Sequence, residues 1–469
     1  MLLHSRPAVW TAFLLVHLWL AVLGVWLIPQ KAFWDLDLYR YWMWLGVHGF
    51  GWPAIDTSWV YPIGATVPML AAGFGGLAIG HGYALAWSIM VTILDVLAMA
   101  MLLRRDRGQV GGWWWTGFLL LLGPIAMGRL DAIVVPLVIA ALLWSMDRPA
   151  VASALLTIGA WIKVAPGALL VPLFWGAHRP WRDVVAPAAG VSAIVMGTAI
   201  GFGGQGHVLS FLLEQGQRGL QIEAPGATPW VLAALFTTSI KRVLNAQIVT
   251  WELLGPGTQK MADLLGLLLP IAAAAAIGLL WWKRERVGLA LWAHRSKRGE
   301  LVVRGAMLMT LVLLVFNKVG SPQYMTWLAA PVAVALVLGL PGWGTTAKWV
   351  LGVGAATQLV FPWEYTEITG GGLGVTLVLA ARNVALIGLL VHTARELFRV
   401  QVDDPAAPSA PADRHRTPEP VSSPKLADAL LVDEAPAAET TPSPAREPVD
   451  PLPRRGALPD GGLASPATP

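Results

Sequence analysis

The sequence contains no cysteine, and charged residues make up only 13% of its 469 positions. The absence of cysteine excludes disulfide bonds, thiol catalysis and cysteine-based metal sites. Soluble domains usually carry about 25% charged residues, about twice the charged fraction of this chain. Hydrophobic residues make up 56% of the chain, which is therefore too apolar for a soluble globular domain. The formal net charge of +5 is small, and we interpret it through membrane topology rather than as a signal for nucleic-acid binding.

Three common catalytic motifs are also missing. The sequence has no phosphate-binding Gly-rich loop, no His-Glu-x-x-His zinc helix and no nucleophile elbow. These absences give no support to an NTPase, a zinc protease or an α/β-hydrolase. Any chemistry is therefore sought in polar residues of the loops that connect apolar segments.

Long apolar segments recur along the chain, and they predict an all-α polytopic membrane protein. A bilayer requires helical spans of about 20 residues, because every backbone polar group must be satisfied within the segment. Many of the 25 Trp residues stand near expected span ends, where an amphipathic ring prefers the interface. The first apolar run has span length and no convincing small-residue cleavage site, so it predicts a first helix rather than a signal peptide. Twelve spans are expected, at residues 8–28, 82–103, 112–128, 131–146, 150–164, 165–178, 184–203, 264–282, 302–317, 324–340, 347–362 and 373–395.

The positions of Lys and Arg set the expected orientation, because cytoplasmic loops collect positive charge. Residues 60–80 are apolar enough to cross, but a crossing would place the basic cluster 104–107 on the outer face. Their Gly and Pro content favours a re-entrant or juxtamembrane helix on the outer side. Both termini are then cytoplasmic, as are the basic loops at residues 104–107, 147–148, 179–182, 283–298, 348 and 395–399. The outer segments are residues 29–81, the long loop 204–263 and the short loops near residues 129, 163, 318 and 364.

The composition changes abruptly at residue 401. Residues 401–469 contain no Trp, Tyr or Phe and hold 15 of the 35 prolines. Such a segment cannot bury enough apolar area to offset its ordering entropy. The sequence therefore predicts a catalytic membrane module at residues 1–400, followed by a disordered Pro/Ala-rich cytoplasmic tail.

Two carboxylates, Asp35 and Asp37, follow the first expected span and stand among aromatic residues. A position beside the membrane and aromatic rings is partly desolvated, which is an environment that suits a general base. The alternative is a hydrated loop whose acidic residues only keep positive charge off the outer side. A metal role for this Asp-x-Asp pattern is not expected, because the pattern is common and unspecific.

Cations also stand at the outer ends of expected helices, where the charge rule disfavours them. Each of Arg129, Lys163 and Lys318 is equally well explained as a side chain that extends to the interface. Charged groups at membrane depth are costly, however, and usually face a water-filled cavity or a partner. Together with the acidic pair, the cations predict a site that holds an anionic headgroup beside a carboxylate base. Further substrate-binding candidates are Tyr39, Tyr61, Asp131, Gln323, Tyr324 and Glu364.

Other polar residues have less defined roles. An acceptor-binding role is considered for four residues of the long outer loop, and a structural role is assigned to three residues inside expected spans. The first group is His207, Glu214, Arg218 and Glu223, and the second is Asp95, Arg382 and Asn383.

Four motifs occur in a fixed order between residues 8 and 400: Asp35-Leu36-Asp37-Leu38-Tyr39, Tyr61-Pro62-Ile63, Gly128-Arg129-Leu130-Asp131 and Lys163-Val164-Ala165-Pro166. In this order they resemble the GT-C glycosyltransferases, and the nearest branch is family 87, the polyprenyl-phosphate-mannose-dependent mannosyltransferases of actinobacterial envelopes. The resemblance implies a GT-C-like bundle with juxtamembrane helices in the first outer loop. It also carries the family's catalytic carboxylate over to Asp35. The chain departs from the family pattern at Asp37, Ile63 and Arg129, which bears on the choice of base, the subfamily and the substrate.

The resemblance implies a multi-pass cell-membrane enzyme whose site faces outside. It would move a sugar, mannose or a pentose such as arabinose, with inversion from a polyprenyl-phosphate donor to a lipid-linked or glycan acceptor. Asp35, helped by Asp37, would accept the acceptor's proton, and the leaving phosphate would be stabilised by Lys163, Lys318 and Arg129. No nucleotide or other cofactor is expected, because the donor arrives through the bilayer along a groove formed by residues 60–80 and neighbouring helices.

Two other functions remain open from the sequence. In a transporter or lipid flippase, the same intramembrane charges would line a translocation path. Inverted repeats would support that function, and none is visible. A noncatalytic scaffold would instead recruit partners through the Pro-rich tail, and the tail would then matter more than Asp35.

Overall fold

The structure is a computed structural model that describes residues 5–214, 218–245 and 250–399. Over these residues the chain is mostly helical, with short 3₁₀ and π segments and one β-hairpin. The expectation of a disordered tail at residues 401–469 lies outside the described residues.

The helical segments of the described residues comprise α-helices and shorter 3₁₀ and π segments. The α-helices are α1 (Arg6–Val22), α2 (Pro29–Ala32), α3 (Trp34–Val47), α4 (Thr66–Ala72), α5 (Gly82–Leu103), α6 (Gly108–Leu122), α7 (Asp131–Trp144), α8 (Pro149–Ile162), α9 (Leu170–Gly176), α10 (Ala186–Gly201), α11 (Ser210–Glu214), α12 (Thr228–Ala233), α13 (Thr258–Ala293), α14 (Arg295–Val315), α15 (Ala329–Val337), α16 (Trp343–Gln358), α17 (Tyr365–Gly370) and α18 (Leu373–Arg399). The 3₁₀ and π segments are η2 (Leu23–Leu27), η3 (Ile63–Ala65), η4 (Gly73–Gly75), η5 (Gly123–Ala126), η6 (Ala165–Leu169), η7 (Trp181–Val185), η8 (Gly204–Gly206), η9 (Pro225–Ala227), η10 (Pro322–Leu328) and η11 (Leu359–Trp363).

Several helices have the length and composition of membrane spans. Within the described residues, five can cross a bilayer by these criteria: Arg6–Leu27, Gly82–Leu103, Trp181–Gly201, Thr258–Gly288 and Leu373–Arg399. Shorter apolar helices lie at Ile63–Gly75, Asp131–Trp144, Pro149–Ile162, Ala165–Gly176 and Pro322–Val337. The structure is therefore compatible with an all-α membrane protein, and the expected number of twelve spans and the side of the termini stay predictions.

The expectation of a loop at the basic residues 283–298 is wrong. Helix α13 continues to Ala293 and α14 begins at Arg295, so most of this segment is helical. The helix is interrupted at Gly288, whose φ of +55° is accessible to glycine without steric cost. Lys, Arg and Glu are good helix formers, so a basic stretch between two spans extends the helices instead of forming a loop.

The first outer segment also folds into short helices. Residues 60–80 contain one helix, Ile63–Gly75, which is shorter than the about 20 residues that a crossing needs. It ends at Gly76, where φ is +99°. Its central part, α4, packs against α3 and α5. The segment is thus a short helix beside the bundle, as its Gly and Pro content indicated.

The long segment 204–263 contains strands, which corrects the purely α expectation. Strands β1 (Lys241–Asn245) and β2 (Thr250–Leu254) pair antiparallel, with Lys241 opposite Leu254. Residues 220–222, which precede α12, join the free edge of β2. The Ile222 amide donates to the Trp251 carbonyl at 3.1 Å, and the Leu253 amide donates to the Leu220 carbonyl at 2.9 Å. β-Branched and aromatic residues in this loop favour such extended pairing.

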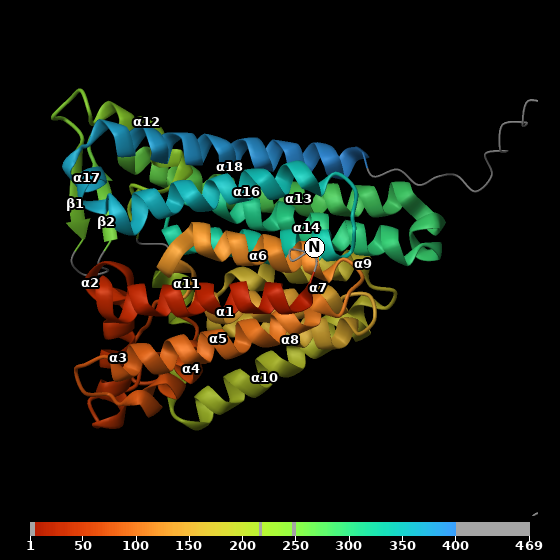
Figure 1. The fold of residues 1–469 in the computed structure, drawn as a ribbon, viewed down its shortest axis with the longest axis horizontal. Helices are drawn as coiled ribbons and strands as arrows, with labels where there is room; N and C mark the ends of the chain where they lie inside the picture. Colours follow the sequence, from red (N-terminus) through yellow and green to blue (C-terminus); the bar gives the residue numbers. More distant parts are fainter. Residues whose placement is uncertain (1–4, 215–217, 246–249, 400–469) are drawn as a thin grey trace, which may run out of the picture. The chain divides into compact units, whose positions relative to one another are not determined.

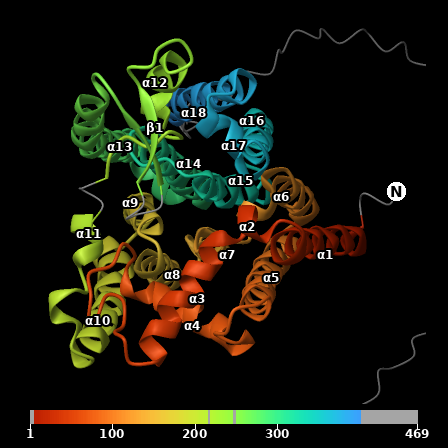
Figure 2. The ribbon, with the colours of Figure 1, turned by 90° about the vertical axis from the view of Figure 1, so that its left-hand side faces the viewer.

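The axes of the long helices are roughly aligned, and the expected outer segments gather at one end of the bundle. Helices α2, α3 and α17 and the hairpin lie together at the left of Figure 1, whereas the α13–α14 connection lies at the opposite end. Figure 2 looks onto the first of these ends, with α3, α10 and α11 on one side and α13 and β1 on the other. Residues far apart in sequence are thereby brought to one end of the bundle.

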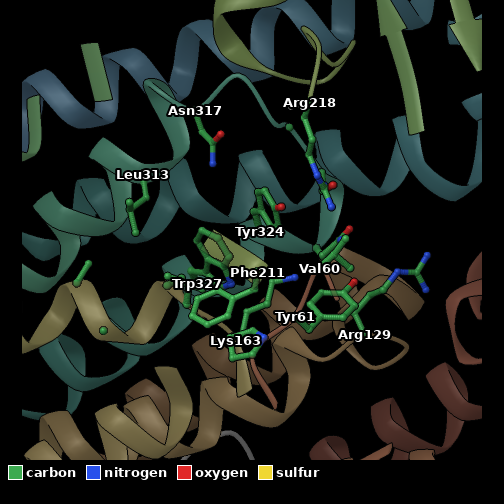
Figure 3. Close-up of a pocket in the computed structure, with 18 of the residues that line it drawn as sticks. Val60, Tyr61, Arg129, Lys163, Phe211, Arg218, Leu313, Asn317, Tyr324 and Trp327 are labelled. Atoms are coloured by element: carbon green, nitrogen blue, oxygen red, sulfur yellow. The ribbon is translucent and has the colours of Figure 1, made fainter. Parts of the chain in front are cut away.

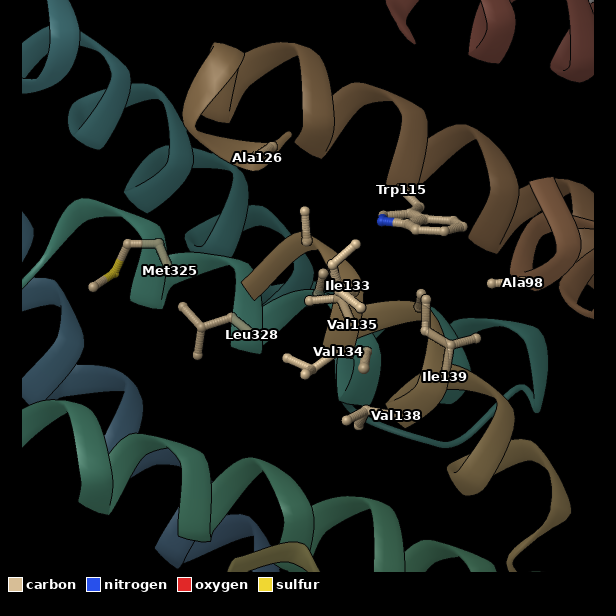
Figure 4. Packing of buried hydrophobic residues seen from close by; sticks show 14 of the residues in the cluster. Ala98, Trp115, Ala126, Ile133, Val134, Val135, Val138, Ile139, Met325 and Leu328 are labelled. Carbon is tan, nitrogen blue, oxygen red and sulfur yellow. The ribbon is translucent and has the colours of Figure 1, made fainter. Parts of the chain in front are cut away.

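The core that fixes this end is formed by α6, α7, α15 and η10 (Figure 4). Trp115, Ile139 and Leu328 are fully buried in it. Nearly every residue of α7 is buried, because neighbouring helices cover all of its faces. This packing fixes the N-terminal end of α7, where the candidate site residues Arg129 and Asp131 lie.

One buried polar pair joins two of the spans. His17 of α1 lies 3.0 Å from Asp95 of α5, measured from Nε2 to Oδ2, and its Nδ1 lies 2.9 Å from the Phe13 carbonyl. Both ring nitrogens therefore have a partner, as buried polar groups require. This contact agrees with the structural role assigned to Asp95.

Candidate functional site

A cavity of about 1870 Å³ lies between the α3–α8–α10 side and the α13–α14 side of the bundle. Seven of the eleven catalytic, phosphate-binding and substrate-binding candidates line it: Asp35, Tyr61, Arg129, Lys163, Lys318, Gln323 and Tyr324. They come from six different segments, and Figure 3 shows Tyr61, Lys163 and Tyr324 close together within it. The structure therefore brings most of the expected polar residues into one space.

Asp35 is held in an ion pair at the cavity wall. It lies in the first turn of α3, where the helix dipole favours negative charge. Its Oδ2 lies 2.8 Å from Nε of Arg129. Arg129 is itself fixed, because Nη1 donates to the carbonyls of Ala32 and Gly128 at 3.0 and 2.8 Å. Asp35 thus has a defined orientation and still borders the cavity.

Asp37 is separated from Asp35 although it is only two residues away. Its side chain is 53% exposed, and its carboxylate lies 3.6 Å from Arg40. It does not line the cavity. Two positions along a helix correspond to a rotation of about 200°, so adjacent carboxylates of an Asp-x-Asp pair point in different directions. The expected assistance of Asp35 by Asp37 has no geometric basis here.

Asp131 and Lys163 form a second ion pair behind the cavity surface. Asp131 is the first residue of α7, is 0% exposed, and accepts a hydrogen bond from Trp327 Nε1 at 2.7 Å. Its other oxygen lies 3.4 Å from Nζ of Lys163. Lys163 has extended backbone directly after α8, which turns its side chain toward α7. Asp131 thus acts on the site through Lys163, since it does not line the cavity.

Two tyrosine rings flank the Lys163 ammonium group. The nitrogen lies 4.9 Å from the centroid of Tyr61 and 5.3 Å from that of Tyr324. An ammonium group near aromatic faces is stabilised by the ring quadrupole. Burial raises the pKa of Tyr61, so its phenol remains a neutral hydrogen-bond donor at neutral pH.

Two other predicted substrate-binding residues lie elsewhere. Tyr39 is fully buried and packs against Tyr61 and Trp87 at centroid distances of 6.2 and 5.5 Å. Glu364 is exposed at the start of α17. Neither lines the cavity. Tyr39 therefore supports Tyr61 from behind, and Glu364 is exposed outside the cavity lining.

No protein-family model matches the chain, and no curated protein matches it either. The site is therefore interpreted from its own geometry.

Further polar residues line the cavity. Arg218 and Glu223, for which an acceptor-binding role was considered from the sequence, both border it. Gln221 and Asn317 also line it. Asn317 begins the polar stretch 317–324 at an expected outer helix end, whereas no pattern in the sequence singled out Gln221. They reach the cavity because the segment before the hairpin packs against the chain that follows α14. The Gln221 amide donates to the Lys318 carbonyl at 3.1 Å.

The part of the cavity within the helices has an apolar wall. It is formed by α9, η7, α13 and α14 through Val171, Phe174, Val185, Leu265, Leu269 and Leu313. This differs from the expected groove at residues 60–80, of which only Val60, Tyr61 and Pro62 line the cavity. The short helix at Ile63–Gly75 packs against α5 instead, so it cannot provide this wall.

Acidic and imidazole side chains do not converge in the described part of the chain. No group of three or more His, Asp or Glu residues there has the arrangement of a metal site. The polar end of the cavity instead combines carboxylates, cations, amides and phenols. Such a set can bind an anion, orient hydroxyl groups and accept a proton.

Proposed function

We propose that the protein is a membrane glycosyltransferase that moves a sugar from a polyprenyl-phosphate donor to a hydroxyl group of a lipid-linked or glycan acceptor. Mannose is the first candidate for the sugar, and the outer face is the proposed side. One observation carries the proposal: a carboxylate, several cations and an apolar wall border the same cavity. These are the features that a phosphate-bearing lipid and a hydroxyl nucleophile require.

The proposed step is an inverting displacement at the anomeric carbon. The acceptor oxygen forms a bond to this carbon as the bond to the phosphate oxygen breaks, and the lipid phosphate leaves with the bonding electron pair. Asp35 accepts the proton of the attacking hydroxyl. Its Oδ2 faces Arg129, so its other oxygen is assigned to the hydroxyl. Cations of the cavity stabilise the charge that develops on the leaving phosphate.

The cavity supports this step because it combines two environments. The polar end contains Asp35 and several cations, and charge would develop there. The apolar wall accommodates an isoprenoid chain, because its hydrocarbon side chains replace the lipid tails that surround the chain in the bilayer. A donor that is delivered through the bilayer needs both environments next to each other.

The test compares two neighbouring carboxylates of the same helix. In Asp35→Asn, transfer of radiolabelled mannose from polyprenyl-phosphate-mannose is expected to fall about 10²- to 10⁴-fold, the usual contribution of a general base. Asp37→Asn is the matched control, because Asp37 is exposed and outside the cavity, and it is expected to retain transfer. Arg129 keeps its two carbonyl partners in Asp35→Asn, so the variant is expected to fold.

Folding of both variants is checked by size-exclusion elution in detergent. Transfer at the unmodified rate by folded Asp35→Asn would show that Asp35 is not the base. If transfer fell equally in Asp35→Asn and Asp37→Asn, the fall would reflect the loss of a negative charge from this segment and not the position of Asp35 in the cavity.

A further inference from the structure

The cations of the cavity differ in how their charge is already balanced. Arg129 pairs with Asp35, and Lys163 pairs with the fully buried Asp131. A phosphate that bound to either cation would compete with a carboxylate for the same donors. These two cations are therefore better suited to orient carboxylates than to receive the anion of a ligand.

Arg218 has no such partner among the residues that the structure describes. No carboxylate lies within ion-pair distance of it there, and its Nε is buried without a hydrogen-bond acceptor. Figure 3 shows its side chain extending from the loop into the cavity, on the side where Tyr324 and Tyr61 lie. Burying a charged donor without a partner is costly, so this position is explained if a ligand supplies the acceptor.

Gln221 presents a second unused donor to the same cavity. The residue is 2% exposed, and its Nε2 has no hydrogen-bond partner. It lines the cavity together with Arg218. The large majority of buried side-chain polar atoms in native proteins have a hydrogen-bond partner. Two unsatisfied N–H donor groups three residues apart and bordering one cavity indicate a site for an anionic or strongly polar ligand.

The segment that carries both donors is held rigidly. The Gly219 amide donates to the Glu252 carboxylate at 3.0 Å, and the Gln221 amide donates to the Lys318 carbonyl at 3.1 Å. At the end of the segment, Glu223 pairs with Arg382 of α18 at 2.9 Å. Glu223 is the acidic residue of this segment that lines the cavity, and the Arg382 guanidinium offsets its charge. The backbone that carries both donors is thus held in place before a ligand arrives, which reduces the entropy lost on binding.

We infer that Arg218 and Gln221 bind the phosphate group of a lipid phosphate, while Arg129 and Lys163 orient the carboxylates Asp35 and Asp131. A guanidinium presents N–H donors in a planar fork that matches two phosphate oxygens. The apolar wall borders the same cavity, which favours a phosphate carried by an isoprenoid chain over free phosphate. The inference rests on the proposed function, because it assigns the donor's anionic group within that site.

The experiment measures binding and needs no transfer. The purified chain in detergent is titrated with a fluorescent polyprenyl phosphate and with the same polyprenol lacking phosphate, by fluorescence anisotropy. In Arg218→Gln, affinity for the phosphate lipid is expected to fall about 10- to 100-fold, as for the loss of hydrogen bonds to a charged group. Affinity for the polyprenol is expected to stay unchanged. Gln221→Leu is expected to show a smaller loss in the same direction.

Lys241→Gln is the matched control, because it removes one positive charge from an exposed position in the hairpin that does not line the cavity. It is expected to bind both lipids as the unmodified chain does. Inorganic phosphate at the concentration of the lipid is expected not to displace the probe.

Three results would overturn the inference. They are unchanged binding of the phosphate lipid by Arg218→Gln, equal losses for the phosphate lipid and the polyprenol, and displacement of the probe by inorganic phosphate. Asp35→Asn distinguishes the inference from the proposed function, because it is expected to lose transfer and retain binding. If Asp35→Asn retained transfer while Arg218→Gln lost phosphate-dependent binding, only the proposed catalytic role would fail.

Discussion

Replacing Arg382 by Met is expected to destabilise the protein strongly. The Arg382 guanidinium donates to the Glu223 carboxylate at 2.9 Å and to the Glu223 carbonyl at 2.8 Å, and the two side chains are 1% and 2% exposed. Removing one partner of a buried ion pair leaves an uncompensated charge, which costs about 3–5 kcal/mol. The double variant Glu223→Gln/Arg382→Met removes both charges and is expected to recover at least half of that loss.

The assay is unfolding in mixed micelles of dodecylmaltoside and SDS, followed by tryptophan fluorescence. Asp37→Asn provides the exposed comparison, because its pair with Arg40 is half in solvent and such pairs contribute about 0.2–1 kcal/mol. The reasoning would be refuted if Arg382→Met unfolded at the same SDS fraction as the unmodified chain. It would also be refuted if the double variant were no more stable than the single one, because the cost would then not come from the stranded carboxylate.

Two further predictions concern packing and pH. In Gly320→Ala, the new methyl group would lie 2.2 Å from the backbone nitrogen of Ala224. We expect this overpacking to lower the free energy of unfolding by about 1–3 kcal/mol. The control Gly352→Ala has open space around the new methyl group and is expected to be neutral or slightly stabilising in the same unfolding assay. Burial raises the pKa of Tyr39 and Tyr61. Above the ordinary tyrosine pKa of about 10, the folded chain therefore retains protons that the unfolded chain loses, and stability should fall as pH rises. Thermal unfolding between about pH 9 and 11 should show a shallower decline for Tyr61→Phe, and identical slopes would contradict the prediction.

Apolar run length predicted the helical character well but not all helix boundaries. The expected spans 82–103 and 373–395 correspond to α5 and α18 almost residue for residue. The prediction of a loop in the basic segment after residue 282 was wrong, since α13 and α14 extend through it. Charge indicates which side of a membrane a segment prefers, but Lys and Arg do not end a helix.

The candidate site was predicted only in part. The sequence indicated the position of Asp35 after the first span and the cations at distant helix ends. Seven of the eleven catalytic, phosphate-binding and substrate-binding candidates line one cavity. The choice between Asp35 and Asp37 was not readable, because it depends on which face of α3 meets Arg129. Gln221 carries no motif, and its role depends on the edge pairing of its segment with β2.

The sequence by itself determined a chain of apolar helices and the residue types at their ends, because hydrophobicity and charge are local properties of short segments. Tertiary structure alone decided which charges are already paired. Arg129 meets Asp35 across 94 positions of sequence, and Arg382 meets Glu223 across 159. Such pairings depend on how the helices pack in three dimensions. These pairings distinguish Arg129 and Lys163, which contact carboxylates, from Arg218, whose side chain points into the cavity.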